Sequence, residues 1–170
     1  MSGATRTAQK EATPIATIGS PPSSSSHRAR SAQIIHLSAE YWPYIRTGGL
    51  AEAVRGMASF QSLAGSRTTV LLPLFLSIRQ GDYGLEPVGE EFRVETGNRV
   101  ERARLWEASR QTAGVRVLLL ENEEYFDRPG VYGEDGQDYL DNHLRFSLLA
   151  SAAVKQIGRA SCRERVCHRV

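Results

Sequence analysis

Residues 46–52, with the sequence RTGGLAE, decide the predicted fold because they link an apolar run to a helical pattern. The apolar run, residues 34–37 (IIHL), is typical of a buried strand, and a proline-containing aromatic loop follows at residues 41–44 (YWPY). After the two glycines, apolar residues recur at three- and four-residue steps, which predicts an amphipathic helix ending near Gly65. Its apolar positions are Leu50, Ala53, Val54, Met57, Ala58 and Leu63.

Two adjacent glycines between a strand and a helix N-terminus form a geometry suited to anions. Gly48 and Gly49 carry no Cβ, so their backbone can come close to a ligand. The first N–H groups of the helix have no helical acceptor and lie at the positive end of its dipole. Arg46 adds a planar cation that suits phosphate oxygens. The alternative is that the glycines only make a tight strand-to-helix turn.

The rest of the sequence predicts an α/β fold with a parallel sheet. Residues 68–72 (TTVLL), closed by Pro73, form a second strand, and the strand–helix–strand order is typical of a crossover between parallel strands. Residues 115–120 (VRVLLL) are expected to form a further continuous apolar strand. Ligands bind beyond the carboxyl ends of such strands, and the glycine pair follows the first of them.

An antiparallel hairpin is expected to be inserted into this sheet at residues 90–106, with its turn at Gly97-Asn98. Its alternating apolar positions are Phe92, Val94, Val100, Ala103 and Leu105. The Glu and Arg residues between these positions favour a solvated face with cross-strand pairing over any catalytic role for the carboxylates.

A second helix is expected to begin near Asp141. Its apolar side carries Leu144, Leu148, Leu149, Ala152 and Ala153. Asp141 suits the N-cap or first turn, and its distance of four residues from Arg145 favours an ion pair along the helix surface. Ahead of this helix, Tyr125 and Phe126 are expected in the core, with Asp127 and Arg128 as a local ion pair. His36 and His143 are expected to be ordinary structural residues.

Three stretches of this sequence match the motifs of one enzyme family. They are residues 38–52 (SAEYWPYIRTGGLAE), residues 125–133 (YFDRPGVYG) and residues 139–146 (YLDNHLRF). Together they resemble the N-terminal signatures of bacterial glycogen synthases and plant starch synthases. Most members of this family carry Lys where this chain has Arg46, so the charge is kept but its shape differs.

The resemblance implies a Rossmann-like, incomplete N-terminal half of a two-domain GT-B glycosyltransferase. Such enzymes transfer glucose from ADP-glucose to an α-1,4-glucan with retention, and neither a metal nor a cofactor is implied. By the resemblance, the residues that bind ADP-glucose are Arg46, Gly48, Gly49 and Tyr132, with Thr47, Glu52 and Asp141 in supporting positions. Glu52 matches an acid of the family and is expected to cap or orient.

Composition divides the chain into three segments. Residues 1–31 are rich in Ser and Thr, which predicts a disordered extension, or a plastid transit peptide. Residues 32–156 carry the family resemblance and a net charge of −4, which argues against a nucleic-acid partner. Residues 157–170 resemble the translation of a sequencing adapter, and the second helix is expected to break there. Both cysteines lie in this last segment, so the body can hold neither a disulfide framework nor a thiolate zinc site.

Two other functions stay open at this stage. The chain could be a non-catalytic glucan- or phosphate-binding module, or a different doubly wound nucleotide enzyme, although neither G-x-G-x-x-G nor G-x-x-x-x-G-K-[ST] occurs in it. The family's H-x-H-D-W segment is also missing, so we expect no complete catalytic set and no activity of this chain alone. The implied location is the bacterial cytoplasm, with no membrane partner, or the plastid if residues 1–31 are a transit peptide.

Overall fold

The computed structural model describes residues 33–109 and 113–166. The main sheet is mixed, and its five strands lie in the order β1-β2-β5-β4-β3. Strands β1 (Gln33–Leu37), β2 (Arg67–Pro73) and β5 (Arg116–Glu121) are parallel to one another. The expected strands and the parallel crossover are therefore confirmed. The predictions for residues 1–31 lie outside the described residues.

The predicted hairpin joins this sheet and is longer than expected. It consists of β3 (Leu85–Thr96) and β4 (Arg99–Ala108), and β4 pairs antiparallel with β5. The register shifts between Val88 and Phe92, where Gly89 has a φ of 71°. β3 advances by four residues here while β4 advances by two, and such an irregularity bends the strand. The alternation holds for Phe92, Val94, Ala103 and Leu105, whereas Val100 is 60% exposed next to the turn.

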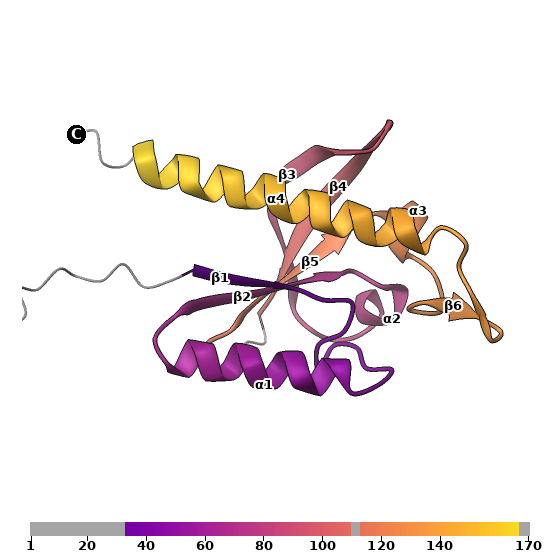
Figure 1. Cartoon of the computed structure of the whole chain (residues 1–170), viewed down its shortest axis with the longest axis horizontal. Coiled ribbons are helices and arrows are strands. Elements are labelled where there is room, and N and C mark those ends of the chain that lie inside the picture. Colours follow the sequence, from indigo (N-terminus) through magenta and orange to yellow (C-terminus); the bar gives the residue numbers. More distant parts are fainter. Residues whose placement is uncertain (1–32, 110–112, 167–170) are drawn as a thin grey trace, which may run out of the picture. The chain divides into compact units, whose positions relative to one another are not determined.

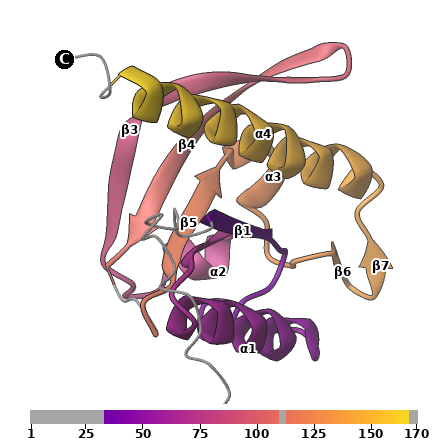
Figure 2. The ribbon, with the colours of Figure 1, turned by 60° about the vertical axis from the view of Figure 1, so that its left-hand side comes forward.

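Two long helices lie on opposite sides of the sheet, α1 (Leu50–Leu63) on one and α4 (Asn142–Val166) on the other (Figures 1 and 2). Because both faces are covered, β2 and β5 carry continuous apolar runs, and Val70, Leu72, Leu119 and Leu120 are fully buried. The expected inner side of α4 is confirmed for Leu148, Leu149, Ala152 and Ala153, and Leu144 is partly buried against the same core.

Four short elements were not predicted from the sequence. They are the one-turn helices α2 (Leu76–Arg79) and α3 (Glu123–Phe126) and the small hairpin of β6 (Gly133–Glu134) and β7 (Gln137–Asp138). The small hairpin turns through Asp135 and Gly136, which both have positive φ, as a tight two-residue turn requires. Tyr125 and Phe126, expected in the core, are buried on α3.

The predicted bounds of α1 are confirmed, but its apolar side was only partly right. The helix buries Ala51, Val54 and Ala58 against the sheet. Leu50, Met57 and Leu63, which were expected on the same side, are 46%, 51% and 78% exposed. Ala51, Val54 and Ala58 face the sheet, because small side chains let the helix backbone approach it closely. The larger apolar residues lie on the exposed side of the helix.

The expected break at residue 157 is wrong, because α4 continues to Val166. A helix needs no apolar period to continue, only a stretch without strong breakers. Residues 157–166 contain no proline and a single glycine, and three of the ten are Arg, a residue that helices accommodate well. The origin proposed for this tail stays a prediction, and residues 167–170 lie outside the described part.

Candidate functional site

The glycine pair lies in the loop between β1 and α1, beyond the carboxyl end of a parallel strand. Neither Gly48 nor Gly49 has a positive φ, and a Cβ added to either would meet no heavy atom within 4 Å. Packing within the described residues therefore does not require glycine at these positions. The two residues leave an open approach to the backbone at this end of the sheet.

The N-terminus of α1 next to the glycines has no side-chain cap. Gly49 is its N-cap residue, and its carbonyl accepts the first helical bond, from the Ala53 N–H at 3.1 Å. The N–H groups of Leu50, Ala51 and Glu52 in the first turn have no helical acceptor, as at any helix start. Among the described residues, none of these N–H groups, nor that of Gly49, has a hydrogen-bond acceptor. The positive end of α1 is open to an anion.

The Gly48 N–H, by contrast, is already used inside the protein. It donates to Glu40 Oε2 at 3.1 Å, and the Thr47 N–H donates to the same oxygen at 2.7 Å. The Thr47 hydroxyl donates to Glu40 Oε1 at 2.6 Å. Of the two glycine amides, that of Gly48 is therefore bound within the protein, and that of Gly49 has no acceptor among the described residues.

Glu40 also receives a hydrogen bond from the other side of the site. The Tyr132 hydroxyl donates to Glu40 Oε1 at 2.8 Å across 92 residues of sequence. Burial alone raises the pKa of Glu40, but the hydrogen bonds from Thr47, Tyr132 and Gly48 outweigh it and hold that pKa below its usual value. One buried carboxylate thus binds both Tyr132 and residues 46–49, which we call the glycine loop.

Tyr132 itself is held from two further directions. Its ring lies 6.0 Å from that of Phe146 on α4, and Asn142 Nδ2 donates to its carbonyl at 2.7 Å. Burial and the adjacent Glu40 carboxylate raise the pKa of the phenol above its usual range. The hydroxyl therefore stays protonated at neutral pH and acts as a donor toward Glu40.

Arg46 lies on the exposed side of the loop. Its guanidinium stacks 5.4 Å above the Trp42 ring, and its Nη1 lies 3.8 Å from Glu52 Oε1. The Arg46 side chain is 54% exposed, so it remains open to a ligand. Glu52 also lies 4.0 Å from Arg55, which makes it a partner of both surface arginines rather than a cap.

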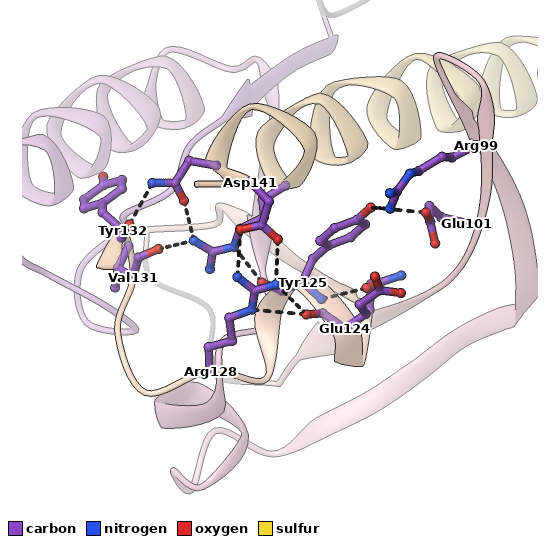
Figure 3. A network of polar contacts seen from close by, with 11 residues as sticks. Arg99, Glu101, Glu124, Tyr125, Arg128, Val131, Tyr132 and Asp141 are labelled. Carbon is purple, nitrogen blue, oxygen red and sulfur yellow. Dashed lines mark hydrogen bonds and ion pairs between the residues drawn. The ribbon is translucent and has the colours of Figure 1, made fainter. Parts of the chain in front are cut away.

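Asp141 has a different partner from the one expected. It forms a two-pronged ion pair with Arg128, at 2.8 and 2.6 Å, and not with Arg145 (Figure 3). Arg128 keeps the pKa of Asp141 below its usual value. The expected Asp127–Arg128 pair is also wrong, because Asp127 lies 4.0 Å from Arg79. Asp141 thus fastens the loop after α3 to the start of α4, where its carbonyl accepts the first helical bonds.

Arg145 is fully buried and ties the same loop to α4 from within. Its guanidinium donates to the carbonyls of Tyr125 and Val131 and to Asn142 Oδ1, at 2.6 to 2.9 Å (Figure 3). Aromatic rings surround it, with the nearest, that of Tyr139, at 4.8 Å. Because Asn142 in turn holds the Tyr132 carbonyl, Arg145 supports the position of Tyr132.

Sequence reasoning assigned no role to Glu40 or Asn142, and it placed Arg145 in an ion pair on the helix surface, whereas Arg145 is fully buried. All three lie within the matched motifs. Their partners are backbone groups and a phenol from other segments, and no period or spacing reveals such contacts. Among residues 33–109 and 113–156, no group of three or more His, Cys, Asp or Glu side chains is placed to hold a metal ion. In the described part of the chain, no helix is both long enough and apolar enough to cross a membrane.

Comparison with known proteins gives a consistent result. The starch synthase catalytic domain family matches residues 33–168. A glycogen synthase of Syntrophotalea carbinolica is 35% identical over 128 residues, covering 74% of this chain and 26% of that protein. A glycogen synthase of Geotalea daltonii is 27% identical over 136 residues, covering 80% and 28%. The chain thus spans about a quarter of the length of these relatives.

A solved structure agrees with the fold. The catalytic domain of starch synthase IV from Arabidopsis thaliana, bound to ADP and acarbose, superposes with a TM-score of 0.64 at 21% identity. The match covers 77% of this chain and 26% of that structure, and it confirms the predicted α/β fold of the GT-B type. Since the family match covers most of the sequence and the fold agrees, the chain belongs to the starch synthase catalytic domain family of glycosyltransferases.

Proposed function

We propose that this chain forms part of the donor site of a glycogen or starch synthase, which transfers glucose from ADP-glucose to an α-1,4-glucan with retention. Family membership supports glucosyl transfer from a sugar nucleotide. The observation that carries the proposal is the open Gly49 backbone at the uncapped N-terminus of α1, beside an exposed arginine. ADP as the nucleotide is favoured by the solved relative, whose structure contains ADP.

In this proposal the diphosphate of the donor docks at the start of α1. The free N–H groups from Gly49 onward and the helix dipole offer partial positive charge, and Arg46 adds a full one. To reach the phosphate, Arg46 would exchange its 3.8 Å contact with Glu52 for a closer, charge-assisted pair. Such fixed charges stabilise the developing negative charge as ADP leaves, without rearranging at the moment of reaction.

Tyr132 would form the opposite wall of the same site. Its loop is anchored through Glu40 to the glycine loop, so the two walls are set relative to each other before a donor arrives. The ring offers an apolar face for a sugar or base. The curated relatives reported above are bacterial, and we extend the proposal to a bacterial cytoplasmic enzyme.

The proposal is tested by titrating the isotope-labelled chain with ADP-glucose and following the backbone amides by NMR. We expect the largest shifts at Gly49, Leu50 and Ala51, and weaker effects with UDP-glucose. Gly49→Ala should weaken ADP-glucose binding about tenfold, because a Cβ would stand where the phosphate approaches the backbone.

Gly56→Ala is the matched control, because Gly56 also has open space around its Cβ position but lies within α1, away from its N-terminus. This change should leave binding unaltered and stabilise the helix by about 1 kcal/mol. The proposal is wrong if ADP-glucose shifts no amide of residues 46–52, or if both glycine variants weaken binding equally.

A further inference from the structure

Glu40 is the most heavily hydrogen-bonded carboxylate of the site. It is 3% exposed, and two donors reach each of its oxygens. Oε2 accepts from the Thr47 and Gly48 amides, and Oε1 accepts from the hydroxyls of Thr47 and Tyr132. An ionised carboxylate has about four lone-pair sites, so this one is saturated by the protein itself.

A saturated carboxylate is poorly suited to act as a base or to bind a sugar hydroxyl. To do either, it would have to release one of four internal hydrogen bonds, and those bonds hold its pKa low. Its contacts instead join segments far apart in sequence, namely the glycine loop after β1 and the loop that carries Tyr132. Glu40 therefore acts through the residues that it holds.

We infer that Glu40 is a positioning residue that holds Tyr132 and the glycine loop in one fixed arrangement, and that it sets the direction of the hydrogen bond made by Tyr132. Because the phenol donates its only proton to Glu40, Tyr132 can offer a ligand only its oxygen lone pairs and its ring. The hydrogen-bond partner of Tyr132 on the donor would then be a hydroxyl of the sugar or ribose. The part of this inference that concerns the donor rests on the proposed function.

The coupling between the two loops is measured first, on the whole 170-residue chain without ligand. Amide hydrogen exchange and NMR shifts of Thr47 and Gly48 are compared in the wild type, Tyr132→Phe, Glu40→Ala and the double variant. Tyr132→Phe should shift both amide signals and speed their exchange about fivefold, since it removes one of the bonds that restrain the carboxylate. In the Glu40→Ala background the same change should have no further effect.

Two further variants keep this test decisive. If Glu40→Ala does not fold, Glu40→Gln replaces it, because glutamine retains the shape of the side chain and one accepting oxygen. In the Glu40→Gln protein, the effect of Tyr132→Phe on the Thr47 and Gly48 amides should be reduced. Tyr139→Phe is the matched control, since the Tyr139 hydroxyl accepts from the Gly130 N–H nearby but makes no contact with Glu40. It should leave Thr47 and Gly48 unchanged.

The donor arm uses the same samples and ADP-glucose as the probe. Glu40→Gln should weaken binding several-fold although Glu40 does not face the donor, whereas Tyr139→Phe should not. If Tyr132→Phe leaves Thr47 and Gly48 unaltered, or if its effect is the same with and without Glu40, the inference fails whatever binds. If the coupling is present but the wild type binds no ADP-glucose, the positioning role stands and the proposed function fails.

Discussion

At the residue scale, Arg46 has two properties that suit a phosphate-binding side chain. It carries a full positive charge, and its exposed side chain can move toward a ligand. It rests on the Trp42 ring and near Glu52 while remaining half exposed. Such surface contacts are weak, so an anionic ligand can replace them at small cost.

We therefore expect Arg46→Ala to weaken ADP-glucose binding more than Arg46→Lys, because lysine keeps the charge and loses only the planar fork. The dissociation constants of the two variants, measured by the NMR titration described above, test this order. Equal losses would count against a role for the charge, and no loss in either variant would remove Arg46 from the site.

Asp141 illustrates how a supporting residue carries a pH dependence. Its pKa is lowered in the folded chain by the hydrogen bonds from Arg128, so its contribution to stability exists above the ordinary carboxyl pKa and is lost as the pH falls. Asp141→Asn should lower the free energy of unfolding by about 1 kcal/mol at pH 7. The difference between the two proteins should shrink once the pH falls below about 4.

Urea unfolding of the wild type and Asp141→Asn between pH 7 and pH 3 measures this directly. Other carboxylates with lowered pKa values, such as Glu40, are present in both proteins and cancel in the difference. A difference that stays constant over this pH range would show that the Arg128–Asp141 pair contributes nothing.

At the element scale, the side of α1 that is buried coincides only in part with the side that its apolar pattern predicts. Its larger apolar residues, including Phe60 at 74% exposed, lie at the rim, and small ones face the sheet. The helix can approach the sheet closely only through alanine and valine. The orientation of α1 also sets the position of its N-terminus, and of the adjacent glycine loop, relative to the end of β1.

We expect Met57→Gln to change the free energy of unfolding of this chain by less than about 0.5 kcal/mol, as for an exposed site. Val54→Ala should cost about 1–3 kcal/mol, because it removes buried methyl groups and leaves a cavity. Chemical denaturation of both variants gives the comparison. A larger loss for Met57→Gln than for Val54→Ala would mean that the side of α1 carrying Met57, and not the side carrying Val54, packs against the sheet.

At the scale of the whole molecule, both walls of the proposed donor site lie on this chain, and we expect the rest of the catalytic set to lie outside it. The chain spans about a quarter of the length of its curated relatives, and within the described residues β1 and β3 form the two edges of the sheet. GT-B enzymes work by closing two halves on their substrates, and this chain matches part of one.

We predict that the purified 170-residue chain, incubated with ADP-glucose and glycogen, transfers no glucose, even if it binds the nucleotide sugar. Incorporation of labelled glucose into glycogen is the measurement, with a bacterial glycogen synthase as the positive control. Transfer above the rate of a sample without protein would contradict the prediction and would place a full catalytic set on this chain.

The sequence by itself determined the parallel strands of the five-stranded sheet, the bounds of α1, the presence of the long hairpin and the family. These features depend on patterns that repeat within a few residues or on contiguous motifs, so neighbours in the chain suffice to define them. The tertiary structure alone decided which side of α1 is buried, that α4 continues past Gln156, and that Asp141 pairs with Arg128. It also decided that Glu40 joins the glycine loop to Tyr132. A polar side chain can accept many partners, and only the folded chain, by bringing distant segments within about 3 Å, selects among them.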